Sequence, residues 1–318
     1  MPRPVATRTL VESALLVAIA TMFSILDAYV PLFALVYPLP IVVLVVRRGV
    51  RAGVWATLVT IAATTMVAGP LQGVTVLTMV GIIGITMAWC IRSRFTPLRT
   101  LLLTSAAVAV SVALTFGLGA AVGGFKLAEL EEALQEGMSS AISLYRSLGV
   151  PEAELTRAQA YVSQVVETAR VTLPALLLTA VVSMAGFNYL LARLVLGKLG
   201  HKLDNIPPFA RWRVTWPFGW GYIAGLILSI AGQARGVPLA WKAGLNVLSL
   251  FGLVFLVQGV ALCWYFMDRY HVNLAVRVIL VVFALFNPIV PQVLSWVGLF
   301  DAWLDFRKLS LESGGRST

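Results

Sequence analysis

The sequence predicts an all-α integral membrane protein with about nine transmembrane helices. Hydrophobic residues make up 59% of the chain and charged residues only 12%, about half the charged share of soluble domains. Apolar runs such as VWATLVTIAATTMV and VLSLFGLVFLVQGVALCWYFM approach or reach the roughly 20 residues that cross a hydrocarbon core. Basic residues occur in short clusters between these runs, which is typical of cytoplasmic loops.

The first region, residues 1–124, contains the first five predicted spans. We place them at about residues 10–27, 32–46, 52–69, 74–91 and 98–124. The second span is short and carries Pro38 and Pro40, which leave backbone carbonyls that protein or water has to satisfy. The preceding segment, Asp27 to Pro31, is predicted to be an external turn.

The second region, residues 125–170, is predicted to form an external helical hairpin. Leucine and other apolar residues recur there at helical spacing. Gly149 is expected to end the first helix, and Pro151 suits the first turn of the second helix. Two roles remain open for this segment, a solvated interfacial hairpin or a lid over an external pocket.

Two further regions complete the chain. Residues 171–214 hold the sixth span, at about 171–196, and a basic loop, and residues 215–318 hold spans at about 216–232, 243–267 and 276–299. Asn287, Pro288, Pro291 and Gln292 interrupt the last span. One broken span, the preferred interpretation, leaves the C-terminus outside, whereas a hairpin of two half-helices returns it inside.

The basic residues predict the orientation of the chain. The N-terminus, the segments RRGVR and RSRFTPLR, and two later loops together hold 15 of the 24 basic residues, against six on the opposite side. Because basic loops remain in the cytoplasm, the N-terminus is predicted to be cytoplasmic. The same clustering between apolar runs argues against a nucleic-acid partner, despite a formal charge of +10.

The sequence carries no catalytic or cofactor signature. It lacks a Walker glycine loop, an HExxH motif, a GxSxG motif and a dinucleotide fingerprint. His201 and His271 both fall in predicted cytoplasmic loops, and Cys90 and Cys263 do not have metal-ligand spacing. We therefore expect no enzyme, no cofactor and no metal site.

The candidate ligand-binding residues are polar side chains within or beside apolar segments. They are Asp27, Tyr37, Gln72 and Arg170 towards the external half, and Asn188 deeper in the sixth span. Polar groups at membrane depth need partners and are functional candidates by default. Interhelical hydrogen bonds are the competing explanation, above all for the amides.

A stripe of small residues, Ala14 and Ala18, marks one face of the first span. Small residues four positions apart let helix backbones approach closely. The stripe therefore serves either packing within the bundle or docking against another membrane protein.

Three segments carry a family resemblance. The loop IPPFARWRVTWPFGWGY, the span GLNVLSLFGLVFLVQGVALCWYF and the tail VGLFDAWLDFRKL resemble the YybS-type family of predicted bacterial membrane proteins, a domain of unknown function. The likeness extends over nearly the whole chain and implies a bacterial plasma-membrane location.

A more remote resemblance concerns the first six spans. The opening ALLVAIATMFSI, followed by a short proline-bearing span, is similar to the S subunits of energy-coupling-factor transporters. That resemblance implies a six-helix bundle that binds a vitamin or metal ion from outside, with Ala14 and Ala18 docking on a membrane coupling subunit driven by separate ATPases. The hairpin and the three C-terminal spans depart from that family.

Together these observations give two functional hypotheses. The first is small-molecule binding related to transport, without intrinsic ATP hydrolysis and with an unidentified ligand. The second is a structural or regulatory membrane protein that acts through protein partners at its basic loops.

Overall fold

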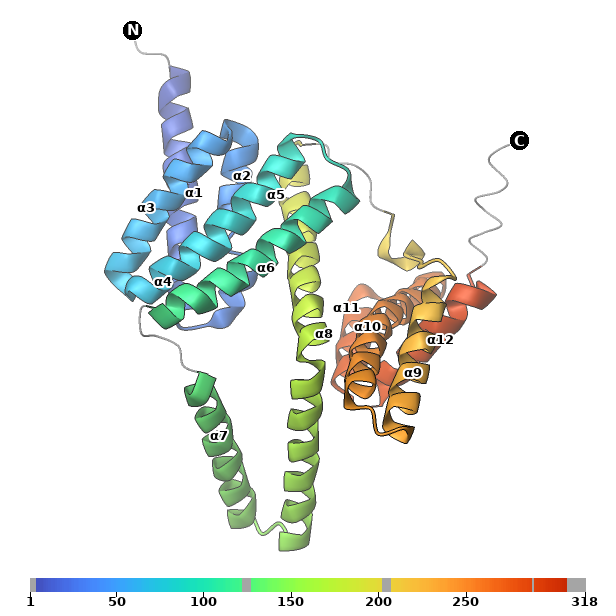
Figure 1. Cartoon of the computed structure of the whole chain (residues 1–318). Coiled ribbons are helices and arrows are strands. Elements are labelled where there is room, and N and C mark those ends of the chain that lie inside the picture. The colour runs from blue at the N-terminus through green and yellow to red at the C-terminus, as the bar shows by residue number, and fades with distance from the viewer. Residues whose placement is uncertain (1–3, 122–126, 202–206, 288, 308–318) are drawn as a thin grey trace, which may run out of the picture. The chain divides into compact units, whose positions relative to one another are not determined.

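The computed structural model describes residues 4–121, 127–201, 207–287 and 289–307, all of which are helical or connecting segments (Figure 1). Two compact units make up the chain. The first contains residues 1–158 and 180–204, and the second contains residues 159–179 and 205–318. Helix α8 (Glu152–Lys198) contributes residues to both units.

Fewer helices than predicted are long enough to cross a membrane. In the part of the chain that the structure describes, six helices have sufficient length and hydropathy, or seven if α11 and α12 form one bent span. Helix α2 (Leu39–Arg48) has 10 residues and α9 (Phe218–Ala234) has 17, so neither reaches the roughly 20 residues required. The predicted count of about nine spans is therefore not reached.

Proline explains why the second predicted span is short. A 3₁₀ helix, η1 (Pro31–Leu35), precedes α2, and the chain turns at Pro38. Pro38 caps α2 and Pro40 lies in its first turn, where a missing N–H breaks no helical hydrogen bond. The prolines thus begin a helix here, whereas the sequence interpretation placed them inside one.

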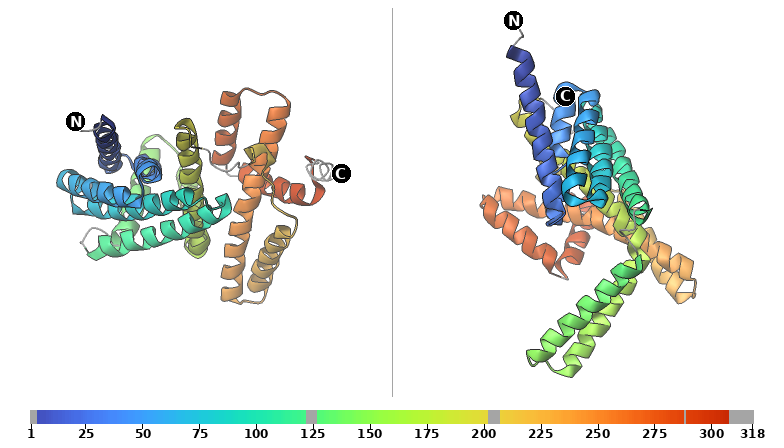
Figure 2. Two further views of the ribbon diagram at one scale, coloured as in Figure 1. Left: turned by 90° about the horizontal axis from the view of Figure 1, so that it is seen from above. Right: turned by 90° about the vertical axis from the view of Figure 1, so that its left-hand side faces the viewer.

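The first unit is built around one continuous span. Helix α4 (Pro70–Thr75), the π-helix η2 (Val76–Gly84) and α5 (Ile85–Arg92) follow without a break. In the 18-residue apolar window of this span 56% of the residues are buried, against 11–33% in the corresponding windows of the other candidate spans. Helices α3 (Val50–Ala68) and α6 (Pro97–Ala121) pack along it, and Figure 2 shows these helices side by side.

Hydroxyl groups hold the π-helix against α6. The Ser111 hydroxyl donates to the Thr78 carbonyl oxygen at 2.8 Å, and the hydroxyls of Thr78 and Thr115 lie 2.6 Å apart. Glycines make the turns at the ends of α3, since Gly49 and Gly69 have φ values of 94° and 88°, which favour glycine. Helix α1 (Pro4–Asp27) packs on α2 and α3.

The predicted hairpin and the sixth span share one long helix. Helix α7 (Leu127–Ser147) ends before Gly149, and α8 begins directly after Pro151, as predicted from these two residues. The second hairpin helix and the sixth span form the single 47-residue helix α8. Leu144, Tyr145 and Leu148 near the hairpin turn are exposed.

The second unit depends on close contact between helix backbones. Helix α10 (Pro238–Arg269) packs against α9 and against α12 (Val290–Leu304), around the aromatic core residues Tyr222 and Phe255. Helix α11 (Leu274–Phe286) has no buried residue and meets α12 at 109°. Pro288, one of the residues predicted to interrupt this region, lies outside the described residues.

Replacing Gly298 on α12 by alanine is expected to destabilise this unit by about 1–3 kcal/mol, as overpacking of a core does. The added methyl group would overlap the Phe255 carbonyl oxygen and lie 2.7 Å from the Gly259 nitrogen. Thermal unfolding in detergent measures the effect. Gly252→Ala on α10 is the control, because its nearest neighbour is 3.9 Å away. Equal melting temperatures for the two variants would refute the role assigned to this contact.

Candidate functional site

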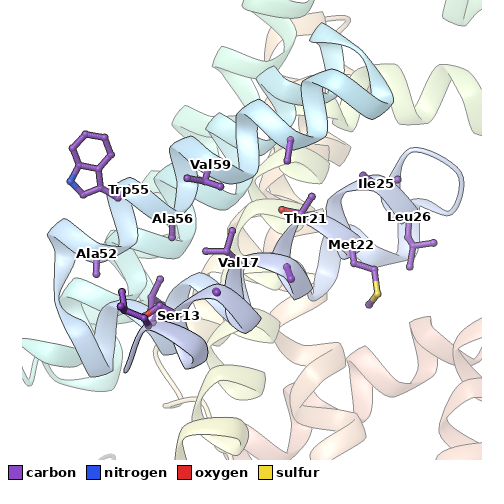
Figure 3. A pocket seen from close by; sticks show the side chains of 15 residues that line it. Ser13, Val17, Thr21, Met22, Ile25, Leu26, Ala52, Trp55, Ala56 and Val59 are labelled. Carbon is purple, nitrogen blue, oxygen red and sulfur yellow. The ribbon is translucent and has the colours of Figure 1, made fainter. Parts of the chain in front are cut away.

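An apolar groove runs between α1 and α3 in the first unit (Figure 3). Its volume is about 970 Å³, at the upper end of the range for small-molecule sites. Small side chains form much of both walls, and Leu44 of α2 also lines it. The wall residues include Ala14, Val17 and Ala18 from α1, and Ala52, Ala56 and Ala63 from α3.

The two ends of the groove differ in character. Figure 3 shows Ser13 and Ala52 at one end, and Met22 and Leu26 at the other. Trp55 borders the first end and is 71% exposed. Five of the fourteen lining residues from α1 and α3 are alanines, and their small side chains leave space between the two helices.

Arginines lie at the Ser13 end of the groove. Glu12 of α1 pairs with both Arg47 and Arg48 of α2, the latter at 2.9 Å. Arg51 follows one residue after the start of α3 and is exposed. Three arginines against one glutamate leave this end with a net positive charge.

Three of the predicted ligand-binding residues come together near the other end of α1. The Gln72 amide donates to the Ser24 carbonyl oxygen at 2.8 Å and reaches Asp27 Oδ2 at 3.5 Å. Tyr37 is buried and lies close enough to Asp27 to feel the charge of its carboxylate. The Gln72 contacts connect α4 to the end of α1.

This polar cluster is adjacent to the groove without lining it. Ile25 and Leu26 line the groove, whereas Asp27, Tyr37 and Gln72 do not. Asp27 Oδ1 is buried and has no hydrogen-bond partner among the described residues. A ligand-binding role for the cluster stays a prediction.

The other two candidates lie on α8. Asn188 is fully buried, and its amide donates to the Met184 carbonyl of the same helix at 3.0 Å. Arg170 is exposed and belongs to the second unit, whereas the Asp27 cluster belongs to the first. Their predicted binding roles are also untested.

The second unit contains a buried ion pair that the sequence interpretation did not identify. Asp301 of α12 and Arg307 are 2.6 Å apart, and both side chains are completely buried. Gln258 of α10 donates to Asp301 Oδ2 at 2.9 Å and accepts from the Val214 backbone N–H, also at 2.9 Å. An aspartate within the apolar run LFDAWL was the available signal.

The arginine extends this network to the loop before α9. Arg307 donates to the carbonyl oxygens of Ala210 and Trp212 at 2.7 and 2.9 Å. Arg213 of the loop pairs with Asp305 at 3.1 Å. The network therefore joins the loop, α10 and α12, the three segments that carry the family resemblance in the sequence.

Asp301→Asn is expected to lower the free energy of unfolding by about 3–5 kcal/mol, because it leaves the Arg307 charge buried without its partner. Thermal unfolding in detergent measures the loss. Asp268→Asn is the control, since the Asp268 side chain that pairs with Arg277 is 65% exposed. If both variants unfold at the same temperature, the buried pair does not stabilise the unit.

The chain is similar to the uncharacterized protein YybS of Bacillus subtilis (strain 168). It is 21% identical over 310 residues, which cover 95% of this chain and 98% of the relative. No solved structure matches the chain. Residues 18–302 match the family described as "Predicted membrane protein (DUF2232)". The YybS-type resemblance is thus confirmed, and the chain belongs to the DUF2232 family of membrane proteins.

Proposed function

We propose that this protein is a non-catalytic bacterial plasma-membrane protein that binds a small amphipathic molecule between α1 and α3. The observation that carries the proposal is the groove, whose volume of about 970 Å³ and mainly apolar lining suit such a molecule. Binding serves transport or presentation of the molecule, without ATP hydrolysis by this chain. The basic residues around α2 and α3 support a cytoplasmic N-terminus.

The polar groups of the groove suit an amphipathic ligand better than a strongly polar one. Ser13 and Thr21 are the polar side chains in its lining, against thirteen apolar ones. Burying a polar ligand there would leave its hydrogen bonds unmade, at a cost of about 1–3 kcal/mol for each group. An acyl or other hydrocarbon chain needs no such partners.

Filling the groove is expected to abolish ligand retention. Ala18→Phe places a ring in the space between the helices, whereas Ala109→Phe adds the same ring to an exposed position on α6. Native mass spectrometry of gently purified protein measures the retained molecule. Retention by wild type and Ala109→Phe, with loss from Ala18→Phe, supports the proposal, and equal retention by all three refutes it.

The second candidate function is that of a partner-dependent structural or regulatory subunit. It is favoured by the facing alanines, Ala14 and Ala18 on α1 and Ala52 and Ala56 on α3, which would let a partner helix approach closely. A coupling subunit, as the resemblance to transporter S subunits implies, would be one such partner.

Ala14→Leu and Ala18→Leu are expected to release such a subunit, because the longer side chains hold the backbones apart. Co-purification from membranes in mild detergent measures the assembly, with Ala109→Leu as the control. An assembly that survives both substitutions would exclude this docking face.

A further inference from the structure

We propose that the ligand of the α1–α3 groove is an anionic phospholipid, with its acyl chain between the helices and its phosphate at Arg48 and Arg51. The inference deepens the proposed function and rests on it. The lipid enters the groove from the surrounding bilayer, and its headgroup lies at the arginine end.

Arg48 and Arg51 lie next to helix faces that line the groove. Arg51 lies four residues before Trp55 on α3, and Arg48 lies four residues after Leu44 on α2. Residues four apart share a helix face, so each arginine extends a face that lines the groove. Both Trp55 and Leu44 are lining residues.

The arginine end of the groove carries a net positive charge. Arg47, Arg48 and Arg51 carry three positive charges, and Glu12 offsets one of them. The net charge of these four side chains is about +2. Arg51 makes no hydrogen bond or ion pair with the described residues. A guanidinium group matches the geometry of a phosphate, which it can bind through two parallel hydrogen bonds.

The groove is about as long as one leaflet of a bilayer is thick. The lining extends from Leu10 to Leu26 on α1, which corresponds to about 24 Å of helix. One leaflet with its headgroups is about 20–22 Å thick, whereas a spanning helix needs about 30 Å of apolar surface. The groove therefore fits one lipid of one leaflet better than a complete transmembrane helix.

An exposed tryptophan borders the arginine end of the groove. Trp55 is 71% exposed beside the arginine end, and tryptophan favours the boundary between headgroups and acyl chains. Deeper in the groove the walls are mainly apolar, with Val17, Ala18 and Val59 beside the single hydroxyl of Thr21. Polar and apolar parts thus follow the order that a phospholipid requires.

The test titrates the delipidated full-length protein with dioleoyl phosphatidylglycerol or dioleoyl phosphatidylcholine in a neutral detergent. Native mass spectrometry counts the bound lipid. We expect tighter binding of the anionic lipid, and a loss of about fivefold in its affinity for each of Arg48→Gln and Arg51→Gln. Arg99→Gln, an exposed arginine at the start of α6, is the charge-matched control and should leave both affinities unchanged.

Ala18→Phe separates this inference from the proposed function, with thermal unfolding confirming that each variant is folded. Loss of both lipids from Ala18→Phe, together with an anionic preference that depends on Arg48 and Arg51, supports the inference. Equal binding of the two lipids, or equal effects of Arg51→Gln and Arg99→Gln, overturns the headgroup assignment while groove binding stands. Undiminished lipid binding by Ala18→Phe overturns both.

Discussion

The absence of water from the hydrocarbon core is the constraint on which this structure depends. In a bilayer, apolar side chains gain little by leaving lipid, so helices associate through close packing and through hydrogen bonds between polar groups. Both devices occur here. Hydroxyls of Thr78, Ser111 and Thr115 join the π-helix to α6, and Gly259 and Gly298 bring the backbones of α10 and α12 into contact.

The same constraint explains the buried ion pair. Asp301 and Arg307 are isolated from solvent, and a charge in this position is tolerated when its partners are fixed. Gln258 and the carbonyls of Ala210 and Trp212 provide those partners. The network accordingly fixes an irregular loop against two helices. Apolar contacts would hold the loop only weakly, because apolar side chains gain little free energy by leaving lipid.

The sequence predicted the helical membrane class, the break at Gly149 and the family, because these follow from hydropathy, turn residues and motifs. It did not predict the number of spans, since Pro38 and Pro40 begin a helix as readily as they interrupt one. It identified Asp27, Tyr37 and Gln72 as candidate ligand-binding residues of one region. No local pattern shows that α3 supplies the second wall of the groove. Partners 43 residues apart, such as Gln258 and Asp301, are equally invisible to periodicity.

Electron cryomicroscopy of the full-length protein in nanodiscs of phosphatidylcholine and phosphatidylglycerol tests whether the space between α1 and α3 is a lipid site. We expect density for one phospholipid between the two helices, with its phosphate beside Arg48 and Arg51. A groove closed by direct contact of α1 with α3, or a headgroup at the Asp27 end, would contradict it.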